Sequence, residues 1–182
     1  HLPSNIYLIG QTSNNKHQTL EMSDYLDIYH SPIGSILIGA SDRGISFVSF
    51  VKEGQEIPKD FLPNNHTLSA IEWLDAFFAS QKLPDSIEYD LKGTEFQKSV
   101  WEYINEIPLG KTITYNDIAK KIPGSHARAV GTATGANPVG IMIPCHRVMG
   151  SDGKLHGYAG GIKRKIWLLA FEQGDSLFLP DV

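Results

Sequence analysis

The pattern of apolar and polar positions predicts a small β-sheet in the first half of the chain. Residues 25–29, 35–40 and 45–51 are rich in β-branched and aromatic side chains, which favour extended backbone. Two groups of turn-forming residues, Pro32-Ile33-Gly34 and Ser41-Asp42-Arg43-Gly44, separate the three segments. The segments therefore predict an antiparallel meander.

A helix and a further strand are expected to complete this half. Residues 86–91 have the composition of a strand, and residues 68–78 have the spacing of a helix. The apolar residues expected to face the core from that helix are Leu68, Ile71, Leu74 and Phe78. The pattern changes near Lys92-Gly93. We therefore expect an N-terminal α/β domain over residues 1–91 and a second domain over residues 92–182.

The second half predicts a mostly helical domain. Thr94 and Gln97 have the spacing of a capping box, which predicts a helix that runs to about Ile107. Its expected buried face consists of Phe96, Val100, Tyr103, Ile104 and Ile107. Two shorter helices are predicted over residues 115–121 and 126–136, the second capped by Ser125. This pair indicates a helix-turn-helix, although any pair of short helices gives the same pattern.

Charge separates the two halves of the chain. Residues 1–90 carry 5 basic and 12 acidic side chains, whereas residues 91–182 carry 11 basic and 8 acidic ones. The net charge of −4 argues weakly against a nucleic-acid binder. The second half is nevertheless suited to phosphate, unless the asymmetry is chance surface variation.

The composition is that of a folded protein without membrane spans. Hydrophobic residues make up 41% of the 182 residues, which is enough for a core, and no apolar run approaches the length that crosses a bilayer. No secretory segment is recognisable, and one cysteine permits no intramolecular disulfide. We expect a cytoplasmic, monomeric protein. The scattered histidines His17, His30 and His66 lack companions at metal-ligand spacing, so we expect no metal.

The single cysteine marks the candidate site. Cys145 stands in Pro144-Cys145-His146-Arg147-Val148, directly after an apolar run. An imidazole and a guanidinium beside a thiol favour the thiolate, which is the reactive form. The alternative is an inert core cysteine, since free cysteines are often buried. The cationic neighbours favour the reactive interpretation.

This motif and others in the same order resemble the O6-alkylguanine-DNA alkyltransferase family. The resemblance runs from about residue 94 to about residue 173. The matching segments are Thr94-Glu95-Phe96-Gln97, Val100-Trp101, Ile107-Pro108-Leu109-Gly110, Thr114-Tyr115, Ala127-Arg128-Ala129-Val130-Gly131, Asn137-Pro138, Pro144-Cys145-His146-Arg147-Val148, Gly157-Tyr158-Ala159-Gly160-Gly161 and Lys165-Ile166-Trp167-Leu168-Leu169-Ala170-Phe171-Glu172. So many motifs in one order are a specific signal.

The resemblance implies a DNA repair protein that moves an alkyl group from guanine O6 to its own cysteine in a single turnover. It also implies a ribonuclease H-like N-terminal domain followed by a helical domain with a helix-turn-helix. Double-stranded DNA containing O6-alkylguanine is the implied partner, in a prokaryotic cell. No cofactor is implied. Some members of the family carry a structural zinc in the first half, and this sequence lacks the cysteines of that site.

The second short helix is unusually rich in small residues, including Ala127, Ala129 and Gly131. Such a slim helix can pack tightly against a neighbouring helix, or it can enter the minor groove of DNA, which offers few base-specific contacts. Arg128 is either a surface ion-pair former or, as the resemblance implies, the side chain that fills the gap left by an extruded base. Tyr115 is either a core tyrosine or a residue that pushes a phosphate and turns the nucleotide out.

The chemistry at O6 needs a sulfur nucleophile and a base. Cys145 is the candidate nucleophile and His146 the candidate base, but neighbours in an extended segment point to opposite faces, so we expect a bridging water. Glu172 would orient and charge the imidazole, giving a Cys–water–His–Glu relay. The alternative is that Glu172 is an ordinary surface residue of the last helix. The resemblance favours the relay. The Asn137 amide is expected to brace the cysteine loop.

Several residues are expected to surround the guanine. Tyr158 would form a wall, and carbonyl groups between Cys145 and Val148 would accept from the exocyclic amine. Ala159 stands where some relatives have a serine, which leaves a backbone N–H to contact O6. Arg147 is expected to tie the loop to the other domain through a carboxylate.

Two alternative functions stay open. A cysteine hydrolase could use the same Cys145, His146 and Glu172, but it would turn over and would not need a helix-turn-helix. A non-catalytic lesion sensor of the same fold would lack the cysteine, and the presence of Cys145 argues against it.

Overall fold

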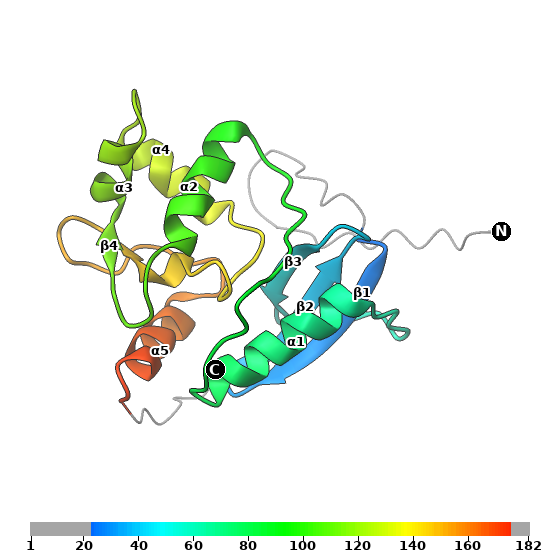
Figure 1. Ribbon diagram of the computed structural model, residues 1–182. Coiled ribbons are helices and arrows are strands. Elements are labelled where there is room, and N and C mark those ends of the chain that lie inside the picture. Colours follow the sequence, from blue (N-terminus) through cyan, green and yellow to red (C-terminus); the bar gives the residue numbers. More distant parts are fainter. Residues whose placement is uncertain (1–22, 176–182) are drawn as a thin grey trace.

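A computed structural model describes residues 23–175 of the chain, and Figure 1 shows a sheet domain beside a helical domain. His17 lies outside the described residues. The N-terminal domain contains an antiparallel sheet in the order β1-β2-β3, with one helix across its face. Its elements are β1 (Tyr25–Ser31), β2 (Gly34–Ala40), β3 (Ile45–Phe50) and α1 (Asn65–Phe78). The predicted meander is therefore confirmed.

The predicted helix of this domain is present, and its buried face was predicted only in part: Leu74 is buried as predicted, Ile71 and Phe78 are partly buried against the core, and Leu68 was predicted wrongly. Leu68 is 53% exposed, and the buried side chains are Thr67, Ala70, Trp73, Leu74 and Phe77. The rings of Trp73 and Phe77 stack with centroids 5.4 Å apart. Large aromatic rings gain most from burial, and they turn the helix so that Leu68 faces solvent.

The strand predicted over residues 86–91 is reduced to a single bridge. Ile45 at the start of β3 pairs with Tyr89, and farther along the same strand Val48 pairs with Val139. Two short segments therefore share the outer edge of β3, and one of them comes from the C-terminal half. Because the two segments divide this edge between them, each forms one bridge with β3 and neither forms a continuous strand.

The C-terminal domain is mostly helical, as predicted. A short parallel pair joins β4 to β5. The elements are α2 (Glu95–Asn105), β4 (Ile113–Thr114), α3 (Tyr115–Lys121), α4 (Ala127–Gly135), a 3₁₀ helix η1 (Cys145–Arg147), β5 (Val148–Met149) and α5 (Ile162–Glu172). In Figure 1, α3 and α4 lie on the side of this domain away from the sheet.

Side-chain caps set where these helices begin. Thr94 forms the complete capping box at the start of α2 that its spacing predicts. Thr114 forms a second one at the start of α3, which was not predicted from the sequence. The prediction that Ser125 caps the next helix was wrong. His126 is the cap of α4, and its Nδ1 accepts from the backbone N–H of Ala129 at 3.3 Å. The imidazole takes the capping position because α4 begins one residue later than predicted.

The buried apolar side chains form a cluster that crosses both domains. Val100 and Ile104 of α2 are buried as predicted, and so is Trp101, which the predicted face omitted. The Trp101 indole donates to the carbonyl of Ala133 in α4 at 2.8 Å. Between the domains, Phe77 of α1 contacts Phe171 of α5 with ring centroids 5.5 Å apart. Among residues 23–175 no helix is long and apolar enough to span a bilayer.

Candidate active site

The cysteine lies in a tight turn and not in the extended segment that the sequence predicted. Cys145 is the first residue of η1, and it is only 7% exposed to solvent. The preceding run, residues 139–143, is almost fully buried and holds this turn in the core of the C-terminal domain. Because the turn is 3₁₀ helical and not extended, the side chains of Cys145 and His146 do not have to point to opposite faces as they would in a strand.

His146 is bound to a carboxylate inside the protein. Its Nε2 lies 2.7 Å from Oε1 of Glu172, and neither side chain is exposed to solvent. The second ring nitrogen, Nδ1, is also buried, and it has no hydrogen-bond partner within the described part of the chain. The imidazole therefore has one nitrogen tied to Glu172 and the other available.

Glu172 is the centre of a larger network. The Arg147 guanidinium donates to both carboxylate oxygens, with Nε to Oε2 at 2.9 Å and Nη2 to Oε1 at 2.8 Å. The backbone N–H of Gly110 donates to Oε2 at 3.1 Å. Burial alone would raise the pKa of Glu172, but the hydrogen bonds from His146 and Arg147 lower it to about 2. Glu172 is therefore ionised at neutral pH.

The prediction for Arg147 was right about a carboxylate and wrong about its place. The carboxylate belongs to Glu172 of the same domain, and the remaining guanidinium nitrogen Nη1 donates to the carbonyl of Ile107 at 2.6 Å. Arg147 is buried and close to Glu172 because α5 packs against η1. Its role is to balance the Glu172 charge and to hold the turn after α2.

The thiol differs from the sequence-based expectation. Burial raises the pKa of Cys145 above its usual value, and the Asn137 hydrogen bond and the positive charge of Lys165 only partly oppose this. Burial also lowers the pKa of His146, against the effect of Glu172. At neutral pH the pair is a neutral thiol beside a neutral imidazole, so the expected resting thiolate was wrong.

Asn137 braces the cysteine loop as the sequence predicted. Its amide nitrogen donates to the carbonyl of Ile143 at 2.8 Å, and its Oδ1 accepts from the N–H of Val139 at 3.0 Å. Both partners lie between Asn137 and Cys145 in the chain. The amide thus closes the loop on itself and lies beside the thiol, whose pKa it lowers.

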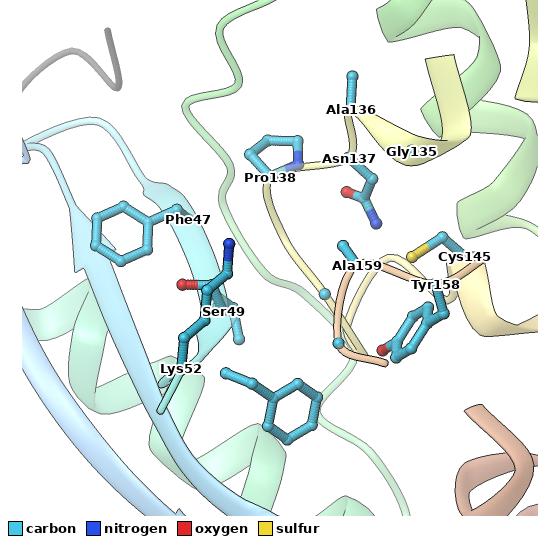
Figure 2. Close-up of a pocket in the computed structure, with 14 residues that line it drawn as sticks. Phe47, Ser49, Lys52, Gly135, Ala136, Asn137, Pro138, Cys145, Tyr158 and Ala159 are labelled. Carbon is cyan, nitrogen blue, oxygen red and sulfur yellow. The ribbon is translucent and has the colours of Figure 1, made fainter. Parts of the chain in front are cut away.

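A cavity of about 160 Å³ opens beside the sulfur. Figure 2 shows the sulfur of Cys145 directed toward Asn137 and Ala159, with strand β3 on the opposite side. The residues that line the cavity are Phe47, Val48, Ser49, Phe50, Lys52, Gly135, Ala136, Asn137, Pro138, Gly140, Cys145, Tyr158, Ala159 and Gly160. Two protein domains therefore contribute to one cavity.

Two tyrosines lie close enough to Cys145 for its charge to affect their pKa values. The pKa of Tyr115 is raised by burial and by the negative charge that Cys145 would carry as a thiolate. The same two causes raise the pKa of Tyr158 well above 10. The Tyr115 ring lies beside Gly131, where an added Cβ would come within 3.9 Å of it. The start of α3 and the middle of α4 therefore meet near the cysteine.

The outer face of α4 carries small residues and one cation. Val130, Ala133 and Thr134 are buried, whereas Arg128 and Thr132 are exposed. Within residues 23–175 the Arg128 guanidinium forms no hydrogen bond or ion pair, so the surface ion pair considered for it is not formed there. The face is slim and solvent-accessible.

Comparisons with known proteins identify the family. Residues 95–174 match the model of the 6-O-methylguanine DNA methyltransferase DNA-binding domain, and residues 25–91 match that of the 6-O-methylguanine DNA methyltransferase ribonuclease-like domain. The chain belongs to the O6-methylguanine DNA methyltransferase family. The family resemblance predicted from the motifs around Cys145 is therefore confirmed, and the ribonuclease-like description fits the sheet domain.

Relatives of this methyltransferase cover most of the chain. A methylated-DNA–protein-cysteine methyltransferase of Methanosarcina acetivorans is 43% identical over 152 residues, which is 81% of this chain and 97% of that protein. A protein of the same name from Mycolicibacterium paratuberculosis is 43% identical over 80% of this chain and 90% of its own. The crystal structure of Mycobacterium tuberculosis OGT in complex with DNA has a TM-score of 0.71 and 38% identity, over 81% and 91% of the two chains.

The methyltransferase site brings together some of the predicted residues and leaves others apart. Asn137, Cys145, Tyr158 and Ala159 line the cavity. Val148 is fully buried and is not among the lining residues, and its carbonyl accepts from the ammonium of a buried lysine. The predicted DNA-contacting residues Ala127, Arg128, Ala129 and Gly131 do not line the cavity and lie on α4.

Lys165 is the residue that the sequence reasoning missed. It is 1% exposed, and its Nζ donates to the carbonyls of Val148 at 2.7 Å and of His156 at 3.3 Å. A lysine in a basic helix is normally a surface residue, so the burial of Lys165 was not predicted. Its spacing from Leu168 and Glu172 would have placed all three on one face of α5.

The histidines of the N-terminal domain contact other side chains. His30 contacts Ser35, and His66 lies 3.5 Å from a carboxylate oxygen of Glu88. Within residues 23–175, no three His, Cys, Asp or Glu side chains gather in a group that could hold a metal ion.

Proposed function

We propose that this methyltransferase repairs O6-alkylguanine in double-stranded DNA by moving the alkyl group to the sulfur of Cys145. The observation that carries the proposal is a cysteine on a cavity wall, next to a histidine whose Nε2 is held 2.7 Å from a buried carboxylate. Such a set can make a nucleophile on demand and stabilise the proton that the nucleophile loses.

The proton follows the order Cys145, His146, Glu172. One water molecule beside the buried Nδ1 of His146 takes the thiol proton and passes a proton to Nδ1. The Glu172 carboxylate then stabilises the imidazolium. Because the thiol is protonated at rest, deprotonation and attack occur together once the substrate is bound. The S–C bond forms as the C–O6 bond breaks, and its electron pair goes to O6 of guanine.

The alkylated base has to leave the duplex before this reaction, because its O6 carbon lies within the base stack. We assign this step to α3 and α4, which form a helix-turn-helix unit. The slim outer face of α4, with Ala127, Ala129 and Gly131, enters the minor groove. Arg128 fills the gap in the stack, and Tyr115 pushes the phosphate at the start of α3.

The flipped guanine is recognised mainly by backbone groups. Tyr158 stacks against one side of it, and the N–H of Ala159 donates toward O6. The Val148 carbonyl accepts from the exocyclic amine with its second lone pair, since its first is used by Lys165. Asn137 keeps the loop rigid around the thiol. Little of this recognition reads neighbouring bases, which suits repair in any sequence context.

The product is a thioether, which the groups around Cys145 do not hydrolyse. Each protein molecule therefore acts once, as a monomer, and needs no cofactor. A reducing prokaryotic cytoplasm would keep the single thiol competent. A hydrolase would instead release its product and turn over.

The test is a titration of repair against protein. An excess of duplex oligonucleotide carrying O6-methylguanine is mixed with increasing protein, and the remaining lesion is measured after the reaction stops. The proposal expects one lesion removed per protein molecule, and none with Cys145→Ala. Several lesions removed per molecule would instead indicate a hydrolase.

A further inference from the structure

The cavity beside Cys145 is closed on its far side by a strand of the other domain. The N–H of Val48 in β3 donates to the carbonyl of Pro138 at 2.9 Å, and the N–H of Gly140 donates to the carbonyl of Val48 at 2.8 Å. These two bonds fix β3 against the segment that leads to the cysteine. Phe47, Phe50 and Lys52 consequently become part of the cavity wall.

The wall next to β3 consists of backbone and closely packed rings. Gly140 and Gly160 line it without side chains. A Cβ added at Gly160 would lie 2.6 Å from the Tyr158 ring and 2.8 Å from the Phe50 ring, so the two rings already pack closely there. The space for an alkyl group larger than methyl is therefore the cavity itself, between this wall and the sulfur.

Lys52 is the one charged side chain among the described residues that line the cavity. It is exposed, and its ammonium group forms no hydrogen bond or ion pair within residues 23–175. Figure 2 shows its nitrogen directed into the space between Phe47 and Pro138. The positive charge therefore faces the cavity without a protein partner.

The neighbouring cation is already engaged. The Arg164 guanidinium lies 4.4 Å from the centre of the Phe50 ring, donates from Nε to the carbonyl of Ile33 at 2.7 Å, and donates from Nη1 to the carbonyl of Gly160 at 3.0 Å. These contacts hold the Arg164 guanidinium against the wall, and Arg164 is not among the residues that line the cavity. Lys52 is thus the group able to meet an anion on the substituent.

We propose that Lys52 makes this methyltransferase selective for O6-adducts that carry a carboxylate, such as carboxymethyl, over neutral adducts of the same size. The inference rests on the proposed transfer to Cys145. In that transfer the S–CH2 bond forms and the CH2–O6 bond breaks. The thiol proton leaves through His146, guanine regains a proton at N1, and the carboxylate keeps its charge beside Lys52.

The comparison that isolates this charge uses two isosteric adducts. Duplex oligonucleotides carry O6-carboxymethylguanine or its neutral amide, O6-carbamoylmethylguanine, and a third carries O6-methylguanine. Single-turnover rates are measured for the wild type, Lys52→Met, and Lys52→Arg, which retains the charge. Lys59→Met is the matched control, since Lys59 is an exposed lysine of the same connecting segment outside the cavity lining.

The expected readout is the ratio of the carboxymethyl rate to the carbamoylmethyl rate. Lys52→Met should lower this ratio roughly three- to fivefold, the size of a partly exposed ion pair. Lys52→Arg and Lys59→Met should keep the wild-type ratio. Added salt should reduce the ratio in the wild type.

Two other outcomes would overturn the inference. An equal loss of rate on all three substrates would mean that Lys52 contacts a DNA phosphate, because such a contact does not depend on the adduct. An unchanged ratio in Lys52→Met would mean that the ammonium does not reach the substituent. Failure of the wild type to transfer methyl at all would instead refute the proposed function, so the two failures are distinguishable.

Discussion

His146 and Glu172 are joined by a 2.7 Å hydrogen bond in a place that solvent does not reach. Arg147 lies on the same carboxylate and balances its charge. An imidazolium formed during the reaction would therefore be stabilised by a carboxylate that is already ionised and held in position. In the proposed transfer, this pair receives the thiol proton after the substrate binds.

Replacing Glu172 should separate chemistry from binding. Glu172→Gln removes the charge that stabilises the imidazolium and should slow alkyl transfer on the order of 100-fold, the scale of general acid–base effects. DNA affinity should change little because the Glu172 side chain is not exposed to solvent. Single-turnover rates and fluorescence anisotropy measure the two quantities. Equal rates for both proteins would show that Glu172 serves only the fold.

The same carboxylate should govern acid stability. The pKa of Glu172 is lowered to about 2 in the folded protein from 4.5, so its contribution to the free energy of unfolding is present above pH 4.5 and is lost as the pH falls toward 2. Urea denaturation across this range should show the difference between wild type and Glu172→Gln shrinking with acid. A constant difference would mean that the ionised carboxylate does not stabilise the fold.

The cysteine should titrate above the ordinary thiol value of about 8.5, because burial raises its pKa. The rate of alkylation by iodoacetamide against pH should have its midpoint above that value. Lys165→Met should move the midpoint higher still, since it removes a positive charge that favours the thiolate. A midpoint below 8.5 would instead support the lowered thiol pKa that the motif alone indicated.

Arg128 should matter only where a base must be flipped. Arg128→Ala removes an exposed cation from α4 and leaves the relay intact. It should slow repair of duplex DNA at least tenfold more than reaction with free O6-benzylguanine, which needs no flipping. Lys82→Ala, which removes an exposed cation of the N-terminal domain, is the control. Equal losses on both substrates would make Arg128 a structural residue.

The sequence predicted features whose signals are local. The capping box at Thr94 depends on two residues three positions apart, and α2 begins where those residues predict. The face of α1 could not be predicted in the same way, because the packing of Trp73 and Phe77 against other elements decides it. The His126 cap depends on where α4 begins, which the sequence missed by one residue.

The site was predicted where its residues share a motif and missed where the fold brings them together. Cys145 and His146 are neighbours in the chain, and Glu172 was found through the family motif. Lys52 reaches the same cavity from a different domain, through the bonds between Val48 and the segment before Cys145. The raised thiol pKa likewise follows from burial, which a pattern of neighbouring residues does not reveal.

The location of the transferred group tests the central claim most directly. The protein is mixed with excess O6-methylguanine duplex, digested with protease, and its peptides are weighed by mass spectrometry. Transfer to sulfur predicts that the peptide containing Cys145 gains the mass of one methylene, since methyl replaces the thiol hydrogen, and that fragmentation places the gain on Cys145. An unmodified Cys145 peptide after complete loss of the lesion, or a methyl group on another residue, would contradict it.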